Sequence, residues 1–276
     1  MQTDMTVGKP MKMILDFTIP VFIGNVFQQF YNMADAIIVG KFVGTKGLAA
    51  VGSTGTIMFL IIGFLTGLTA GFTVLTSQKF GAGKMDEMRQ SVGNAALLSI
   101  IISVIMTAVS MVGMHSLLTL MHTPEDIFQD AYTYIMIICG GIFAQVLYNI
   151  LASILRALGN SKTPLYFLIL AALLNIVLDL TFIIVFHMGV AGAAWATITA
   201  QGVSGMLCLI YIIKCVPELR LKADDWRFRS EIAKKEILVG NSHGTAVFHH
   251  CDRNHDGTVC TEYSWFLCSS GIYGRK

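Results

Sequence analysis

Residues 92–114 read VGNAALLSIIISVIMTAVSMVGM, a stretch without a single charged side chain. A helix needs about 20 predominantly apolar residues to cross the hydrocarbon core of a bilayer, and this stretch is long enough to do so. It therefore predicts a membrane-spanning helix and places the chain among integral membrane proteins.

The composition of the whole chain supports the same class. Of the 276 residues, 54% are hydrophobic and only 13% are charged, with a mean hydropathy of +0.66. A soluble domain carries about 25% charged residues, because charges must cover its surface. Here the charges cluster between long apolar stretches, so we expect no soluble enzyme. The net charge of +2 is too small to suggest a nucleic-acid partner.

Five more stretches meet the same length criterion. We therefore expect an all-α integral membrane protein with a bundle of six transmembrane helices over residues 13–213. Residues 1–12 precede this bundle, residues 214–240 are predicted to form a linker, and residues 241–276 form a polar tail. The predicted spans are 13–39, 49–76, 92–114, 127–155, 165–186 and 190–213. Gly63, Gly67 and Gly71 repeat every fourth residue, which suits close packing of helices in lipid.

Basic residues between the spans predict the orientation of the chain. One set of connections carries many Lys and Arg residues, whereas the opposite set carries only Lys41 and Lys46. Cytoplasmic loops carry the excess of basic residues, so we expect a multi-pass protein of the plasma (cytoplasmic, inner) membrane with its N-terminus in the cytoplasm. The basic residues on the predicted cytoplasmic side include Lys9, Lys12, Lys79, Lys84, Arg89, Arg156, Lys162 and Lys214.

Two carboxylates lie inside predicted spans. Asp35 follows Tyr31 by four residues and Asp179 follows Asn175 by four, so each pair shares a helix face. Ionisable groups are expensive in hydrocarbon and tend to face a cavity or a partner. Such a group could bind a proton or a small hard cation such as sodium. The plainer alternative for Asp35, near the end of its span, is a carboxylate satisfied by interfacial water.

Other polar side chains occur in the fourth and sixth spans. Tyr134, Gln145 and Asn149 lie in the fourth span, and Thr197, Thr199 and Gln201 lie in the sixth. An isolated Asn or Thr in a membrane helix usually makes an interhelical hydrogen bond, and this is the alternative to a binding role. Pro20 in the first span removes one backbone hydrogen bond and so offers a point at which that helix can bend.

The order and spacing of several short motifs resemble the multidrug and toxic compound extrusion (MATE) family, from about residue 5 to residue 239. These motifs are Ile19-Pro20, Tyr31-Asn32-Met33-Ala34-Asp35, Gly81-Ala82-Gly83, Arg156-Ala157-Leu158-Gly159-Asn160 followed by Thr163-Pro164, and Asn175 with Asp179. The resemblance implies a transporter that exports organic cations and other amphipathic small molecules in exchange for H+ or Na+, without a cofactor. It also implies that Tyr31, Asp35, Tyr134, Asn149, Asn175, Asp179 and Thr197 match the cation-binding group of the family's N-terminal lobe.

The family's members usually have twelve helices in two six-helix lobes, whereas this chain has one predicted lobe. The resemblance therefore implies a second lobe or a second copy of the chain as a partner. A single lobe could also be inactive by itself.

The polar tail contains two patterns that resemble metal-binding motifs. Asp252, Asn254 and Asp256 resemble the start of an EF-hand loop, but position 12, where the bidentate glutamate belongs, is Tyr263. Histidines and cysteines also gather in the tail, yet no CxxC pair anchors a zinc site. We therefore expect both patterns to be chance and predict no metal site. The histidines and cysteines concerned are His243, His249, His250, Cys251, His255, Cys260 and Cys268.

A shift of reading frame near Gly240 explains the tail better. Residues 241–246 can be written AAT-TCC-CAT-GGG-ACT-GCA, and without the first nucleotide this string reads Ile-Pro-Met-Gly-Leu-Gln. The recovered Ile-Pro pair repeats Ile19-Pro20, as expected for the entry to a seventh membrane helix. We therefore expect residues 241–276 to be a disordered, out-of-frame tail.

Three functions stay open at this point. The first is one lobe of a cation-coupled multidrug exporter. The second is a lipid-linked oligosaccharide flippase of related architecture, whose cavity should be cationic, whereas the charged residues deep in these spans are carboxylates. The third lies outside transport: an inactive truncated membrane product or a membrane-anchored metal-binding module.

Overall fold

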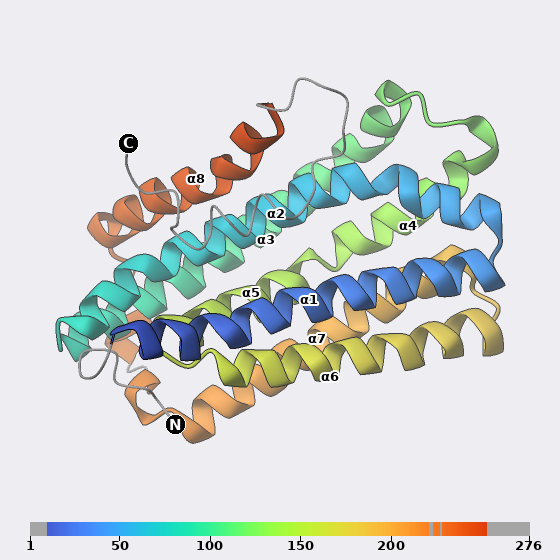
Figure 1. Cartoon of the computed structure of the whole chain (residues 1–276). Helices are drawn as coiled ribbons and strands as arrows, with labels where there is room; N and C mark the ends of the chain where they lie inside the picture. Colours follow the sequence, from blue (N-terminus) through green and yellow to red (C-terminus); the bar gives the residue numbers. More distant parts are fainter. Residues whose placement is uncertain (1–9, 221–222, 227, 253–276) are drawn as a thin grey trace.

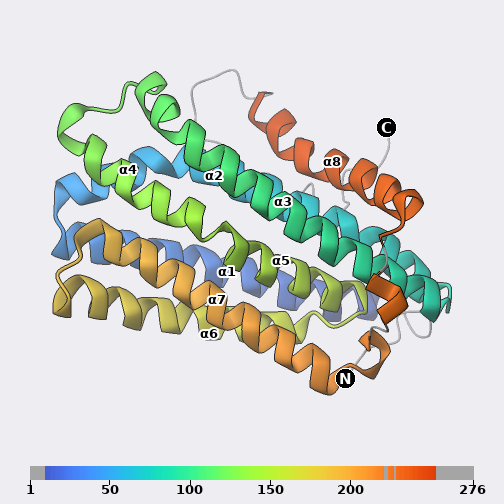
Figure 2. The ribbon, with the colours of Figure 1, turned by 180° about the vertical axis from the view of Figure 1, so that it is seen from behind.

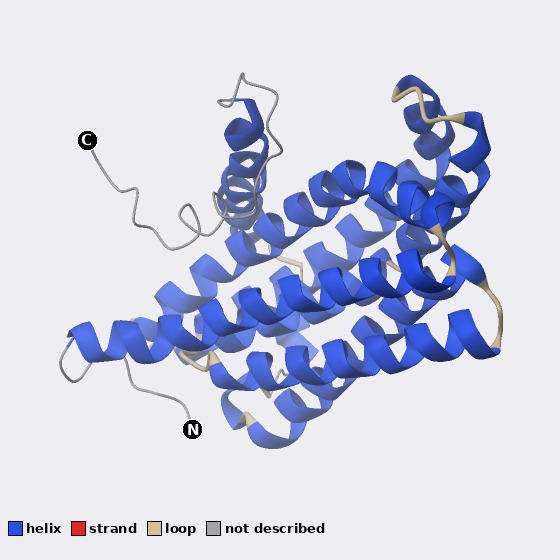
Figure 3. Cartoon of the chain, turned by 45° about the vertical axis from the view of Figure 1, so that its right-hand side comes forward, coloured by secondary structure: helices blue, strands red, loops and turns tan. Residues whose placement is uncertain are grey.

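The computed structural model describes residues 10–220, 223–226 and 228–252, and every element in these ranges is a helix (Figure 1, Figure 3). The long helices are α1 (Pro10–Phe42), α2 (Thr45–Gly81), α3 (Met85–Leu120), α4 (Glu125–Gly140), α5 (Ile142–Ala157), α6 (Lys162–Leu180), α7 (Gly189–Cys215) and α8 (Ser230–Asp252). The short helices are η1 (Thr181–Val185), η2 (Pro217–Leu219) and η3 (Ala223–Trp226).

The predicted all-α membrane fold is confirmed. Each predicted span overlaps one helix or two consecutive helices, with bounds that differ from those of the helices. The fourth span is a bent pair, because α4 and α5 meet at Gly141 with an angle of 47°. The fifth continues from α6 into the π-helical turn η1. Within the described residues, α2, α3, α6 with η1, and α7 are long and apolar enough to cross a membrane, and the bent pair counts as a fifth span.

α1 does not reach that standard of hydropathy, although it is long enough to span. Its second half contains Gln28, Gln29, Asn32 and Asp35, which lower its apolar character. These polar residues are expensive in lipid unless they meet partners inside the bundle. The residues that interrupt the apolar pattern of α1 therefore include a predicted site residue, Asp35.

The long helices run side by side between two ends of the bundle (Figure 1, Figure 2). α2 packs against α3, α4, α5 and α8, while α6 packs against both α1 and α7. One end holds the α2–α3 turn, the α5–α6 turn and the start of α8. The opposite end holds the α1–α2, α3–α4 and α6–α7 connections (Figure 1). Consecutive long helices therefore alternate in direction, when the bent pair of α4 and α5 is taken as one span.

Buried apolar side chains fill the bundle, and other large apolar side chains cover its outside. Phe72 and Leu155 are fully or almost fully buried in the largest cluster, which joins α2, α3, α5 and α7. On the outer face of α3, Val112 is 83% exposed, and Val104 and Val109 are exposed with it. A lipid environment, unlike water, makes no demand for polar groups on that face.

α8 runs without a break through Gly240, where the linker was predicted to give way to the tail. Residues 241–252 continue the same helix. Residues 253–276 lie outside the described residues, and so do Asn254 and Asp256 of the EF-hand-like motif and three members of the histidine–cysteine group: His255, Cys260 and Cys268.

Candidate cation site

The carboxyl groups of Asp35 on α1 and Asp179 on α6 lie within hydrogen-bond reach of each other inside the bundle. Asp35 is 8% exposed and Asp179 is fully buried. Asp35 Oδ1 and both Asp179 oxygens have no hydrogen-bond donor in the described part of the chain. Two carboxylates are both acceptors, so they can bond to each other only with a proton between them.

Positive charge is missing from this pair. None of the Lys, Arg and His side chains that the structure describes forms an ion pair with Asp35 or Asp179. Buried charges are normally paired or coordinate a cation, because an unpaired charge loses its hydration without compensation. The geometry therefore leaves room for a proton or a cation as the missing partner.

Two tyrosines accompany the carboxyl pair. Tyr31 precedes Asp35 by one helical turn on α1, and Tyr134 reaches the same region from α4. Tyr134 is 5% exposed and lies within electrostatic range of Asp35, Asp179 and Tyr31. The structure therefore gathers these four predicted residues from three helices.

Asn175 and Thr197 join the group from α6 and α7. Asn175 Nδ2 donates a hydrogen bond of 3.3 Å to Thr197 Oγ1. Asn175 Oδ1 and Gln201 Oε1 are buried and accept no hydrogen bond from the described residues. Both residues border one small cavity between α1, α6 and α7.

This cavity has a volume of about 10 Å³ and is lined by Tyr31, Leu168, Ala171, Ala172, Asn175, Thr197, Ala200 and Gln201. A space of that size holds about one water molecule. Sites for drug-sized ligands measure about 300–1,000 Å³. The cavity therefore fits a water molecule or a bare ion and not an organic substrate.

Asn149, also predicted to belong to the site, makes its hydrogen bond outside this group of residues. Its Nδ2 donates a hydrogen bond of 3.4 Å to Thr66 Oγ1 and so connects α5 with α2. This is the interhelical role that an isolated Asn usually has in a membrane helix. Gln201, in contrast, borders the cavity although it was not predicted as a site residue. Its position one turn after Thr197 was the signal for it.

The donor atoms of the group are carboxylate, amide and hydroxyl oxygens. Hard cations prefer such oxygens, and a proton needs only the carboxyl pair. Zinc prefers His and Cys ligands, and the described residues contain no group of three or more His, Cys, Asp or Glu that could hold a metal ion. The oxygen donors of this group are therefore of the kind that a proton or a hard cation prefers.

Pro20 lies inside α1, about four turns before Asp35, and is buried. It has no N–H, so the carbonyl of Asp16 loses the hydrogen bond that a helix would give it. The helix continues through this position, and the predicted bend stays a prediction.

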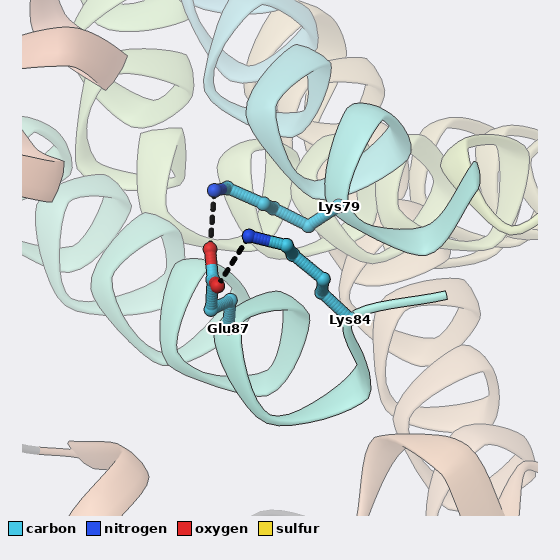
Figure 4. Close-up of polar contacts among 3 residues, drawn as sticks. All are labelled: Lys79, Lys84 and Glu87. Carbon is cyan, nitrogen blue, oxygen red and sulfur yellow. Dashed lines mark hydrogen bonds and ion pairs between the residues drawn. The ribbon is translucent and has the colours of Figure 1, made fainter. Parts of the chain in front are cut away.

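A second polar cluster lies at the opposite end of the bundle, beside the α2–α3 turn (Figure 4). Glu87 accepts hydrogen bonds from Lys84, at 2.9 Å, and from Lys79. Arg89 pairs with Asp86 and, at 3.9 Å, with Asp225 of η3. From the sequence, these three basic residues are predicted to mark the cytoplasmic side of the chain. Their carboxylate partners show that they also hold the turn and the segment after α7 in place.

Comparison with known proteins gives consistent matches. The MatE family model matches residues 20–181. A Bacillus subtilis protein described as "Probable multidrug resistance protein YpnP" is 34% identical over 239 residues, which cover 86% of this chain and 54% of that protein. A Thermotoga maritima protein described as "Probable multidrug resistance protein NorM" is 27% identical over 233 residues, covering 81% and 49%.

The fold also matches solved structures. A MOP superfamily transporter from Pyrococcus furiosus superposes with a TM-score of 0.82 and 28% identity, covering 89% of this chain and 54% of that one. The chain spans about half the length of the curated relatives it matches.

Proposed function

This chain belongs to the MatE family of membrane transporters, which are not enzymes, and on that premise we propose that it is the first lobe of a cation-coupled multidrug exporter. The observation that carries the proposal is the buried pair of Asp35 and Asp179, which faces no basic side chain of the described residues. We assign this pair the role of holding the coupling ion, H+ or Na+.

In the proposed mechanism the ion cancels the repulsion between the two carboxylates. α1 and α6 pack together when it is bound and move apart when it leaves. Tyr31, Tyr134, Asn175 and Thr197 supply the surrounding hydroxyl and amide groups. Pro20 lowers the cost of bending α1, because one backbone hydrogen bond is already missing there.

The proposed substrates are organic cations or amphipathic small molecules. Two observations support this class: the matched relatives are described as multidrug resistance proteins, and the ionisable groups of the site are acidic. The cavity near Asn175 is too small for such a substrate. We therefore place the substrate between this lobe and a second one, supplied by another segment or by a second copy of the chain.

We further propose that the end with the α2–α3 turn faces the cytoplasm, in a plasma membrane. Lys79, Lys84 and Arg89 gather at that end. An excess of basic residues marks the cytoplasmic side of short membrane loops.

Reconstitution into proteoliposomes tests the proposal. The full chain should move ethidium against a H+ or Na+ gradient, and the gradient that drives the movement identifies the ion. Asp179→Asn should reduce transport to the level of empty vesicles. Asp130→Asn changes an exposed carboxylate on α4 and should leave transport unchanged.

Normal transport by Asp179→Asn would contradict the assignment of the site. A chain that is inert even with its intact Asp35–Asp179 pair would favour the inactive truncated product.

A further inference from the structure

α8 is pressed against α2 where glycines allow the two backbones to approach (Figure 2). Gly71 of α2 is in direct contact with Gly240 of α8. A Cβ atom on Gly67 would lie 2.9 Å from the carbonyl oxygen of His243, and a Cβ on Gly240 would lie 2.6 Å from the ring of Phe72. Real Cβ atoms do not approach other atoms so closely, so larger residues would separate the helices. The close contact buries one face of the first turns of α8 against α2 and α3.

One consequence is the burial of a carboxyl group, that of Glu236 on α8. Glu236 is 0% exposed, and its Oε1 accepts a hydrogen bond of 2.8 Å from Ser91 Oγ on α3. Ser91 Oγ also lies 3.0 Å from Thr76 Oγ1 on α2. Because the Ser91 proton is given to Glu236, Thr76 must be the donor in the second bond. Two helices, α2 and α3, therefore direct a chain of two hydroxyl groups toward one carboxyl group on α8.

The other oxygen of Glu236 is left without a partner. Oε2 is buried and has no hydrogen bond to any described residue. The surrounding cluster is apolar and includes Phe72, Met88, Val92 and Ala233. A charged carboxylate in such surroundings loses hydration that a single hydroxyl does not replace.

Charged groups on the packed elements do not neutralise Glu236 either. Lys79 on α2 and Lys84 in the α2–α3 turn both pair with Glu87 on α3. Arg89 on α3 pairs with Asp86 on the same helix and with Asp225 on η3. On α8 itself, Glu231, Lys234 and Lys235 are exposed, and the backbone of His243 lies two turns further along against α2. None of these groups forms an ion pair with Glu236 among the described contacts.

We propose that Glu236, Ser91 and Thr76 form a second proton-binding site, separate from the Asp35–Asp179 pair, and that its proton keeps α8 packed on α2 and α3. The protonated carboxyl group is neutral, so it can stay in the apolar cluster. Loss of the proton leaves a buried charge without a partner, and the helix is released toward solvent. The site does not depend on the proposed export function.

The direction of the titration agrees with this assignment. Burial raises the pKa of Glu236 from 4.5 to about 8, although the hydrogen bond from Ser91 acts in the opposite direction. α8 is not among the helices that qualify as membrane spans. A raised pKa in the packed state means that packing takes up a proton, so packing is strongest below about pH 4.5. It weakens as the pH rises to about 8 and is then constant.

Hydrogen–deuterium exchange of the full chain in lipid nanodiscs measures the packing of α8. Protection factors, corrected for the intrinsic pH dependence of exchange, are compared for peptides of α8 and of α5. We expect the protection of α8 to fall about tenfold or more between about pH 6 and about pH 9, because each unit of pKa shift corresponds to about tenfold. The protection of α5 should not change. The series is run in potassium salt and repeated in sodium salt.

Matched variants identify the group. In Glu236→Gln the side chain has the same shape and no charge, so α8 should stay protected across the pH series. Glu231→Gln is an exposed change on the same helix. In this variant α8 should lose protection at high pH as the wild type does. The infrared C=O band of a protonated carboxyl group should weaken in Glu236→Gln and not in Glu231→Gln, and this readout does not depend on helix packing.

Three results would overturn the proposal. One is an unchanged pH dependence in Glu236→Gln, and another is protection of wild-type α8 that does not vary with pH. The third is a change of α8 protection with sodium at constant pH, which would assign the site to a metal cation instead of a proton.

Discussion

Asn175 on α6 donates its Nδ2–H to Thr197 Oγ1 on α7 at 3.3 Å, one turn before Asp179. The side-chain amide of Asn175 is held in place by this bond. Its oxygen atom, Oδ1, is buried, has no hydrogen-bond partner among the described residues, and belongs to a residue that lines the small cavity. The bond therefore joins α6 and α7 beside a buried oxygen atom to which no described residue donates a hydrogen bond.

Thr197→Val removes the hydroxyl group that orients Asn175 and keeps the shape of the side chain. We expect a loss of about 1 kcal/mol in the free energy of unfolding, the usual value of one hydrogen bond. We also expect weaker ion dependence of ethidium transport, because the amide is free to turn. Thermal unfolding and transport assays measure the two effects. Thr199→Val, an exposed change on the same helix, is the control, and equal effects in both variants would contradict the role of Thr197.

Gly71→Ala should displace α8 from α2. The added Cβ would clash with the Cα atom of Gly240. Because that atom belongs to the backbone, no side-chain movement can remove the clash. Gly55→Ala, also on α2, meets nothing within 4 Å and should be neutral or stabilising by up to about 1 kcal/mol, because Ala favours helix over Gly. Hydrogen exchange of α8 peptides and the melting temperature distinguish the two variants. Unchanged protection of α8 in Gly71→Ala would show that the contact is not required.

Ser91→Ala should destabilise the packing of α8 by about 1–3 kcal/mol when Glu236 is present, because it removes the carboxyl group's hydrogen-bond donor. In the Glu236→Gln background the same change should cost less, since an amide, unlike a carboxyl group, cannot become charged at any pH of the experiment. A double-mutant cycle on the melting temperature gives the interaction energy between the two residues. Strict additivity would mean that Ser91 and Glu236 do not act together.

Asn94→Ala should loosen the segment that leads into α8. Asn94 is fully buried; its Oδ1 accepts a hydrogen bond of 2.9 Å from the backbone N–H of Arg229, and its Nδ2 donates to the Gln90 carbonyl. Loss of that acceptor removes a contact worth about 1 kcal/mol, and trypsin should cleave after Arg229 more rapidly. Gln129→Ala removes an exposed amide on α4, and trypsin should cleave this variant at the same rate as the wild type. Equal cleavage rates in the two variants would contradict this anchoring role.

The six apolar stretches were visible in the sequence because a bilayer demands a length and a composition that are both local. The helices extend beyond them, as in Pro10–Phe42 against the predicted 13–39, since hydropathy marks the hydrocarbon region and not the end of the helix. The break between α4 and α5 was not visible. Gly141 is in close contact with the side chain of Ile198 on α7, so the bend there depends on a helix far along the chain.

Part of the candidate site could also be predicted from the sequence. The helical period placed Tyr31 with Asp35 and Asn175 with Asp179 on common faces. It could not show that the two faces meet, or that Asn149 hydrogen-bonds to Thr66 on α2. Those pairings depend on how α1, α5 and α6 pack in three dimensions.

The sequence by itself determined the class of protein, and it marked the carboxylates in the predicted spans, because hydropathy and helical period are properties of neighbouring residues. The tertiary structure alone decided that Asp35 faces Asp179 and that Glu236, in a segment predicted to be a linker, is buried against Ser91. Burial of a carboxyl group depends on which helix covers it, and that helix is supplied by residues far away in the sequence.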